Sequence, residues 1–506
     1  MSQQEGFRPA NMALCVFAIA LGVFMQVLDT TIANVALPTI SGNMGVSFTQ
    51  GTWVITSFTV CNAIGLPITS WLSRRFGEVQ FYIAALFCFI ATSFMCGISQ
   101  NMAEIVFFRA LQGLSAAPLF PMSQVLLMSI FPRAKRGMAL ALIGMVAVVG
   151  PIVGPILGGW LTYNYSWPWI FFINIPVGIF SIVVILAQFK DRPQEKTKPK
   201  LDMVGLVSMA LGVGALQIVL DKGNDLDWFA NNWIIAGSVF SAIMLIFMVI
   251  WELTDEHPVI NLRLFANRNF CVGTILLTLG YGGFFSINLI LPQWLQTQMG
   301  YTALWAGLAA APMGVLPLLL SPILGKFGHR LDMRWLAASS FVVIGISCYW
   351  RAHFNLDVNF ATVALVQLFM GLGIGLFFMP TTTILMSDLN GHEIADGASL
   401  SSFIRTLGAS FSSSLTAWIW ARNSSLHHSL LSENISQYNP LVSQQLQHPT
   451  VESLLQFNQS VTSQGLMLST IDLFAMLTVL FLVLTPFVFF TKKAASHDSS
   501  SMSGGH

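Results

Sequence analysis

Charged side chains are scarce in this sequence of 506 residues. Asp, Glu, Lys and Arg together make up 9% of it, whereas hydrophobic residues make up 55%. A soluble domain ordinarily carries about 25% charged residues. The net charge is only +1 and the basic residues are scattered, so the basic stripe that nucleic-acid binding needs is missing. These scarcities exclude a soluble globular protein and argue against a nucleic-acid partner.

Cofactor and nucleotide motifs are also missing. The six cysteines all lie inside apolar runs and form no Cys-x-x-Cys pair, so we interpret them as small packing residues and expect no metal or other cofactor. No GxxxxGK[ST] phosphate-binding loop occurs anywhere in the chain, which argues against an ATP-driven pump. Transport against a concentration gradient is therefore expected to be driven by an ion gradient. One charge that crosses a potential of 100 mV releases about 2.3 kcal/mol.

The abundant feature is a series of long apolar runs. Each has about 20 residues, the length that a helix needs to cross about 30 Å of hydrocarbon. The expected membrane-spanning helices, fourteen in number, lie near residues 12–37, 50–71, 80–99, 103–130, 137–162, 169–188, 203–220, 232–252, 270–292, 303–324, 335–352, 359–386, 397–419 and 467–490. The first run is too long for a signal-peptide core and is expected to be an uncleaved span. The sequence thus predicts an all-α polytopic membrane protein.

The distribution of Lys and Arg predicts the orientation. Eighteen of the 23 basic residues fall in segments on the side of the N-terminus, and only Lys222, Arg351 and Arg422 fall on the other side. Short loops rich in Lys and Arg stay in the cytoplasm. Because an even number of spans puts both termini on one side, both are expected to be cytoplasmic.

The chain also repeats itself weakly at a shift of about 250 to 258 residues. For example, Gly113 and Leu114 correspond to Gly371 and Leu372. Parallel duplication of a six-helix unit is typical of the major facilitator fold, with the substrate site between the halves. Two helices are left over, which predicts a 6+2+6 arrangement and a hairpin with a structural role. The predicted domains are a bundle at 1–190, linkers and hairpin at 191–268, a second bundle at 269–492 and a disordered cytoplasmic tail at 493–506.

Several motifs resemble those of one transporter family. LDTTIANVALP (28–38), RALQGLSAA (109–117) and GMVAVVGPIVGPILGG (144–159) resemble the first-, fourth- and fifth-helix motifs of the fourteen-span drug:proton antiporters of the major facilitator superfamily. Four further stretches resemble the EmrB-type inner-membrane pumps of that family. They are LDKGNDLDW (220–228), WELTDEHPVI (251–260), LGKFGHRLDMR (324–334) and SSFIRTLGASF (401–411).

The resemblance implies export of diverse hydrophobic drugs in exchange for protons across a bacterial inner membrane. It also implies a tripartite assembly with an EmrA-like membrane fusion protein in the periplasm and a TolC-like outer-membrane channel. One departure concerns the loop after the second helix, where many major facilitator proteins have an aspartate and this chain has Arg74. We therefore do not expect a gating salt bridge from this position in this chain. Glu78 and Asp332 are the two residues that could replace the missing aspartate.

Asp29 and Arg109 are the strongest candidates for proton coupling. Each lies within a predicted span, where an ionisable group costs about 2.5 to 3.5 kcal/mol and ordinarily faces a cavity or a partner. Burial favours the neutral form of a carboxylic acid, whereas a neighbouring guanidinium favours the ionised form. We therefore expect Asp29 to be the coupling acid and Arg109 its tuning partner; the alternative is a fixed structural ion pair.

Other residues are candidates for substrate binding. Gln112 follows Arg109 by three residues and shares its helix face, and Gln26 and Asn34 lie near Asp29 in the sequence. Such residues also serve as hydrogen-bonding glue between membrane helices. Arg405 is either a substrate ligand or a side chain that snorkels to the cytoplasmic surface. Aromatic residues are further candidates for an adaptable apolar pocket; they are Phe284, Phe285 and Phe378.

The fifth predicted helix carries a glycine and proline pattern. Gly150, Gly154 and Gly158 recur every four residues, which lines one helix face without side chains and lets a neighbouring backbone approach closely. Pro151 and Pro155 weaken the hydrogen-bond ladder of the same helix. We interpret this pattern as tight packing, and the resemblance adds that it seals the protein against leak.

The stretch 422–465 is predicted to be a long periplasmic loop. It is too long and too polar for a simple connection, and long loops are often functional. We expect it to contribute to the contact with the periplasmic adaptor.

Two other functions remain open on the sequence alone. The chain is either a drug exporter or a major facilitator carrier for another solute, such as an importer or a siderophore or metabolite exporter. A membrane-embedded lipid enzyme is a weaker alternative, because such enzymes need clustered carboxylates that hold a metal, and no such cluster is visible. The chain is therefore predicted to be a carrier and not an enzyme.

Overall fold

The fold is built from helices that cross the molecule lengthwise. A computed structural model of the chain describes residues 9–46, 48–131, 136–190, 192, 202–255, 258–327, 331–389, 393–433 and 451–492. These residues form helices joined by short connections and include no strand. The predicted tail at 493–506 lies outside the described residues. The all-α class is therefore confirmed.

The first half of the chain forms one helical bundle. Its helices are α1 (Met12–Asn43), α2 (Phe48–Gly51), α3 (Trp53–Phe76), α4 (Glu78–Ile98), α5 (Met102–Ala116), α6 (Leu119–Ile130), α7 (Arg136–Asn164), α8 (Trp169–Phe172) and α9 (Asn174–Gln188). The predicted spans 103–130 and 169–188 are each divided into two helices. The first is divided at Ala117 and Pro118 between α5 and α6, where proline lacks the N–H that would continue the hydrogen-bond ladder. The second is divided at Ile173 between α8 and α9.

A hairpin and a second bundle follow. The hairpin consists of α10 (Met203–Lys222) and α11 (Asn232–Thr254). The second bundle consists of α12 (Arg268–Thr297), α13 (Ala303–Ala310), α14 (Val315–Phe327), α15 (Met333–Arg351), α16 (Phe360–Gly375), α17 (Phe378–Met386), α18 (Ile394–Glu433) and α20 (Val451–Phe487). Among the described residues, 11 helical segments are long and apolar enough to cross a membrane. Helices occupy the position of every predicted span, but the total of fourteen crossings stays a prediction.

Polar residues start many of these helices. Asn11, Asn101, Asp202, Asp332 and Asn359 each accept a hydrogen bond from a backbone N–H in the first turn of the helix that follows. Such caps satisfy N–H groups that have no partner within the helix. They explain why the helices begin close to the predicted boundaries.

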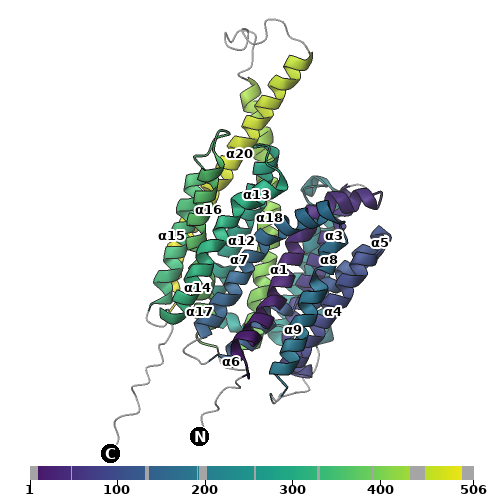
Figure 1. Ribbon diagram of the computed structural model, residues 1–506, viewed down its shortest axis with the longest axis vertical. Helices are drawn as coiled ribbons and strands as arrows, with labels where there is room; N and C mark the ends of the chain where they lie inside the picture. The colour runs from purple at the N-terminus through teal and green to yellow at the C-terminus, as the bar shows by residue number, and fades with distance from the viewer. Residues whose placement is uncertain are drawn as a thin grey trace, which may run out of the picture.

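The two bundles lie side by side and meet along several helices (Figure 1). On one side α7 contacts α13, α14 and α17, and on the other side α3 and α6 contact α18. The hairpin packs against both α3 and α18. Lys222 of the hairpin donates to Thr52 Oγ1 at 2.5 Å, and Asn224 donates to the backbone oxygen of Ser414 at 3.4 Å. The hairpin therefore bridges the two halves of the chain.

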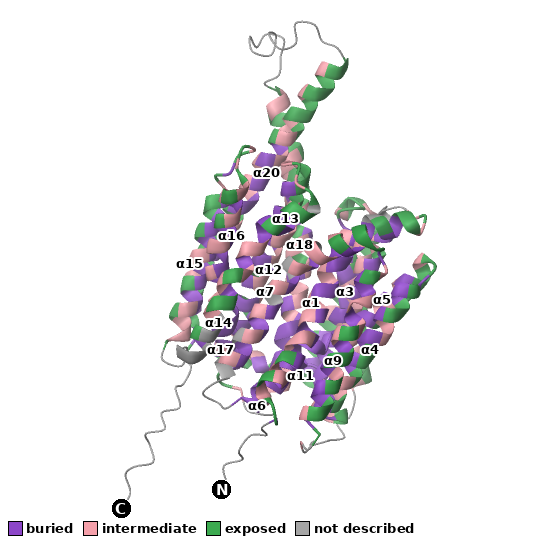
Figure 2. Ribbon diagram, viewed as in Figure 1, coloured by how far each residue is buried: buried purple, intermediate pink, exposed green. Residues whose placement is uncertain are grey.

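The predicted loop 422–465 is helical at both of its ends, so this part of the prediction was wrong. Helix α18 continues to Glu433 and α20 begins at Val451. The two helices extend together beyond the bundle, at the end opposite to the start of α1 (Figures 1 and 2). The sequence did not indicate helices here because these turns are polar. In the structure, contacts between the two helices stabilise them. His428 Nε2 lies 3.2 Å from Asn458 Oδ1, and His427 Nε2 lies 2.7 Å from Asp472 Oδ2.

Candidate functional site

Asp29 and Arg109 form an ion pair inside the first bundle. Asp29 lies on α1 and Arg109 on α5, and Arg109 Nη1 donates to Asp29 Oδ2. The exposed fractions of the two side chains are 0% and 1%. Removing one partner of such a pair typically costs about 3–5 kcal/mol, because a buried charge is left without compensation. The structure thus brings the two predicted residues together, and their role in coupling stays a prediction.

Uncharged polar side chains complete the environment of this ion pair. Gln112 Nε2 donates to Asp29 Oδ1 at 3.1 Å, and Gln112 Oε1 accepts from Arg109 Nη1 at 2.9 Å. Asn174 Nδ2 donates to Asp29 Oδ1 at 3.2 Å. Both amides also contact Ser93 Oγ, at 3.1 Å each. Four helices, α1, α4, α5 and α9, therefore meet in one buried hydrogen-bond network.

Sequence reasoning missed Ser93 and Asn174. Each is a single uncharged polar residue in an otherwise apolar run, SFMCG and FFINIPVG respectively, and such residues often serve only to hydrogen-bond neighbouring helices together. The position of Asn174 beside the interruption between α8 and α9 is a local signal, but nothing in the sequence relates it to Asp29.

The rest of the Arg109 side chain is anchored to α3. Its Nε donates to the backbone oxygen of Val54 at 3.0 Å. Its guanidinium lies 4.2 Å from the ring centre of Phe58 and 5.6 Å from that of Phe171. Gly113 packs directly on the backbone of Phe58, so a glycine is needed where α5 crosses α3. The arginine is thus held from three sides while its terminal nitrogens face Asp29 and Gln112.

The three glycines of α7 pack on α1 around Asp29. A Cβ atom at Gly154 would lie 2.9 Å from Thr31 Cβ and 3.3 Å from the backbone nitrogen of Ile32. Gly150 faces Val27 and Gly158 faces Ile32 in the same way. The side chains of Pro151 and Pro155 lie outside the described residues. The glycine face therefore fixes the distance between α7 and the segment of α1 that carries the buried carboxylate.

Arg405 lies at the boundary between the two bundles. Its guanidinium lies 4.0 Å from the ring centre of Phe120 on α6 and 4.7 Å from that of Tyr281 on α12, and its exposed fraction is 7%. Arg405 is eleven residues into α18, which at about 1.5 Å per residue is about 17 Å along the helix. The side chain is therefore directed into the protein and does not snorkel to the surface.

Aromatic side chains surround Tyr281. Its ring centre lies 6.0 Å from that of Phe284, 6.1 Å from that of Phe285 and 5.9 Å from that of Phe378. Phe378 packs in turn on Gly144 of α7. A small hollow beside this contact is lined from both bundles by Gly144, Met145, Pro317, Ile374, Gly375, Phe378 and Met379. The predicted aromatic residues thus gather where the two halves meet.

The remaining two candidates lie apart from the ion pair. Gln26 is half-buried on α1, and its Oε1 has no hydrogen-bond partner among the described residues. Asn34 is exposed on the same helix. Neither side chain is part of the hydrogen-bond network around Asp29.

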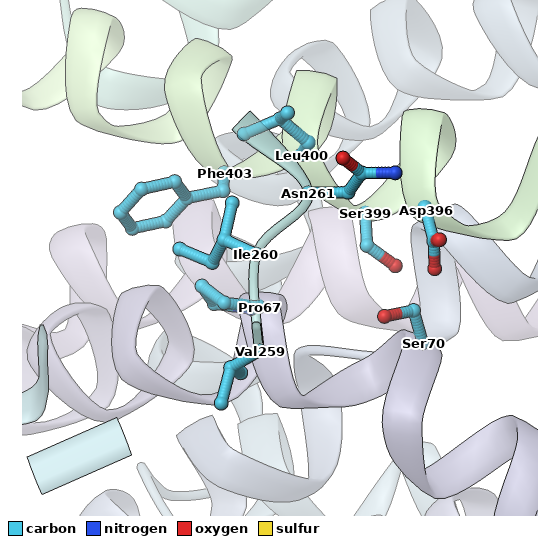
Figure 3. Close-up of a pocket in the computed structure, with 9 residues that line it drawn as sticks. All are labelled: Pro67, Ser70, Val259, Ile260, Asn261, Asp396, Ser399, Leu400 and Phe403. Atoms are coloured by element: carbon cyan, nitrogen blue, oxygen red, sulfur yellow. The ribbon is translucent and has the colours of Figure 1, made fainter. Parts of the chain in front are cut away.

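A second contact between the halves joins the C-terminal end of α3 to the N-terminal end of α18. Arg74 Nη1 on α3 donates to both carboxylate oxygens of Asp396 on α18, at 2.8 and 3.0 Å. Figure 3 shows the pocket beside it, which is lined by residues of α3, of α18 and of the segment 259–261. Glu78 pairs instead with Arg192, and Asp332 with Arg334. The two proposed substitutes for the missing loop aspartate therefore serve other pairs, and Arg74 itself links the halves.

Comparison with known proteins agrees with this architecture. The model of the Major Facilitator Superfamily matches residues 19–413. The chain is 44% identical to the multidrug export protein EmrB of Escherichia coli K12 over 97% of its length and 98% of that protein. It is 43% identical to the fatty acid resistance protein FarB of Neisseria gonorrhoeae over 98% of each chain. The solved structure of the proton:xylose symporter XylE matches with a TM-score of 0.60 at 12% identity, covering 96% of both chains.

The fold and these relatives define a multi-pass membrane carrier. The chain belongs to the Major Facilitator Superfamily, in the group of the EmrB multidrug export proteins.

Proposed function

We propose that this chain is a proton-coupled antiporter that exports structurally diverse hydrophobic compounds across the bacterial inner membrane, with both termini in the cytoplasm. The observation that carries the proposal is the buried pair of Asp29 and Arg109. A carboxylate enclosed by donors can exist as ion or as acid, and each form requires a different arrangement of its neighbours. This is the property that a proton carrier needs.

Protonation of Asp29 changes the balance of forces around α1. The ionised carboxylate attracts the guanidinium of Arg109, and the neutral acid does not. Helix α1 packs on the glycine face of α7, and α7 contacts α13, α14 and α17 of the other bundle. A shift of α1 relative to α5 is therefore transmitted through α7 to the boundary between the halves, where alternating access takes place.

The substrate site is proposed to lie at the same boundary. Phe284, Phe285 and Phe378 would supply apolar surface, which suits ligands that differ in shape. Arg405 would orient a polar group of the ligand, because its guanidinium is stacked between two rings. Gln26 and Asn34 are proposed to offer hydrogen bonds from the first bundle as the two halves rock apart, and Gln112 would do so only on leaving the network around Asp29.

Drug export is tested in cells that contain or lack the gene. A panel of lipophilic compounds is used, including a fluorescent one whose accumulation is followed directly. We expect lower accumulation and greater resistance with the gene, and we expect both effects to vanish when nigericin and valinomycin together collapse the proton gradient and the membrane potential. Equal accumulation with and without the gene, or export that persists without the gradient, would overturn the proposal.

The helical extension of α18 and α20 is proposed to dock the EmrA-like periplasmic adaptor that leads to a TolC-like channel. Leucines are exposed along it, with exposed fractions of 55% at Leu426, 48% at Leu430 and 63% at Leu455. Leu426 and Leu430 are four residues apart on α18 and share a helix face, and apolar side chains grouped on a polar surface mark sites of protein contact.

Replacing Leu430 and Leu455 together with serine is expected to reduce co-purification of the adaptor at least tenfold. Transport by the purified chain in liposomes should stay unchanged, because the extension lies outside the bundle. Ser460→Ala, on the same extension, is the matched control. Full adaptor recovery with the double variant would exclude this surface as the docking site.

A further inference from the structure

We propose that Asn174 is a positioning residue that hydrogen-bonds Asp29 in both of its protonation states, by rotating its side-chain amide. The inference rests on the proposed role of Asp29 as the coupling acid. It adds a residue to the proton site and assigns it a motion.

In its ionised state Asp29 has hydrogen-bond donors at both of its carboxylate oxygens. A carboxylate only accepts hydrogen bonds, and Asp29 accepts from Arg109 at Oδ2 and from Gln112 and Asn174 at Oδ1. The structure therefore corresponds to the deprotonated carrier. Asn174 contributes its Nδ2 to this state.

The protonated state has a different requirement, because its new O–H needs an acceptor. Gln112 Oε1 already accepts from Arg109, and Ser93 Oγ donates to the backbone oxygen of Phe171 while it accepts from both amides. Asn174 Oδ1 is buried and has no hydrogen-bond partner among the described residues. An unpaired buried acceptor costs about 1–3 kcal/mol. The free acceptor is thus held directly beside the group that gains the proton.

Asn174 can rotate where Gln112 cannot. Turning the Gln112 amide would direct its NH2 group at the guanidinium of Arg109, donor against donor. The amide of Asn174 touches no cation: its Nδ2 contacts only Asp29 and Ser93. A half turn exchanges Nδ2 for Oδ1 in front of both Asp29 and Ser93, so the Ser93 hydroxyl has to turn from the backbone oxygen of Phe171 to donate to Oδ1, and Nδ2 becomes the unpaired atom of the amide. The rotation therefore replaces a donor to the carboxylate by an acceptor for the acid.

Few other titratable groups face this site. Arg109 on α5 is the charged neighbour, and Cys96 on α4 lies 3.6 Å from Gln112 Oε1. Helices α6, α8 and α9 contain no ionisable residue, and α7 has its ionisable residues only near its two ends. Titration near the proton site is therefore expected to report on Asp29.

Infrared difference spectroscopy of the purified full chain in liposomes tests the proposal. The spectrum of the acid form minus that of the alkaline form should contain a carboxylic acid band that Asp29→Asn removes. It should also contain a shifted amide carbonyl band that Asn174→Leu removes, because the carbonyl passes from unpaired to hydrogen-bonded. Ser181→Ala is the matched control: Ser181 also lies on α9 and donates to Ala18 of α1 at 2.7 Å, without contact to Asp29. It should keep both bands.

The transport rate gives a second readout. Asn174→Leu is expected to lower the maximal rate of proton-driven transport about tenfold while KM stays within about twofold, as expected for the loss of one hydrogen bond to a charged group. Asn174→Ser, which keeps a group that both donates and accepts, should restore part of the rate. A carboxylic acid band without any amide band that depends on Asn174 would overturn this inference alone. Absence of the Asp29 band would instead refute the proposed function.

Discussion

Asp29→Asn protein is expected to lose uphill transport completely while it still equilibrates substrate across the membrane. The amide keeps the shape of the carboxylate but carries no titratable proton. In the wild-type protein each proton exchanged adds about 1.36 kcal/mol per unit of imposed pH difference. Two units therefore support a substrate gradient of up to about a hundredfold for one proton. The measurement is substrate accumulation in proteoliposomes with and without the pH difference.

The matched control for this change is Asp472→Asn. Asp472 undergoes the same chemical change but lies on α20, where it contacts Asn423 and His427 and is 42% exposed. It should accumulate substrate like the wild-type protein. Accumulation by Asp29→Asn protein in response to the pH difference would show that the buried pair of Asp29 and Arg109 is structural, which is the alternative reading of the same geometry.

Gly154→Ala is expected to destabilise the first bundle and to make the protein leak protons. The new methyl group would lie 2.9 Å from Thr31 Cβ, closer than real Cβ atoms come to such a neighbour, and 3.3 Å from the backbone nitrogen of Ile32, so α1 has to shift. Overpacking of this kind typically costs about 1–3 kcal/mol. Because the affected turn of α1 carries Asp29, the displacement also loosens its network. Thermal unfolding in detergent and the decay of an imposed pH difference in liposomes measure the two effects.

Gly159→Ala on the same helix separates packing from helix propensity. A Cβ atom there would meet only Val35 Cγ1, at 3.9 Å, so nothing has to move. Alanine favours a helix over glycine by roughly 0.5–1 kcal/mol, and this variant should be as stable as the wild-type protein or slightly more stable. Equal behaviour of the two variants would show that close approach of α7 to α1 is unimportant.

Much of the fold was predictable because lipid imposes simple rules on a chain. Apolar runs of about 20 residues reveal helices, since every backbone group in hydrocarbon must be paired within its own segment. The positions of Asp29 and Arg109 were predictable for the same reason: a charge inside a span is costly and seldom lacks a partner. That two residues 80 positions apart are partners was inferred only from the need of each charge for a partner and not from any local pattern.

The uncharged members of the site were not predictable. Ser93 and Asn174 carry no charge, and a lone polar residue in a span often only joins neighbouring helices, so neither marks a functional site as a buried charge does. Asp396 was missed as the partner of Arg74 because the two residues lie 322 positions apart and belong to different halves. Nor did hydropathy reveal the extension of α18 and α20, since helices that stabilise each other in water need no apolar run.

The central claim is that the protein exchanges substrate for protons that move in the opposite direction, and that Asp29 carries these protons. Its most direct test is to load proteoliposomes that contain a pH-sensitive dye with substrate, dilute them and follow the internal pH without any imposed proton gradient. The proposed antiport predicts that outward flow of substrate acidifies the interior in the wild-type protein and not in Asp29→Asn protein. Outward flow without acidification in the wild-type protein, or equal acidification in both proteins, would contradict it.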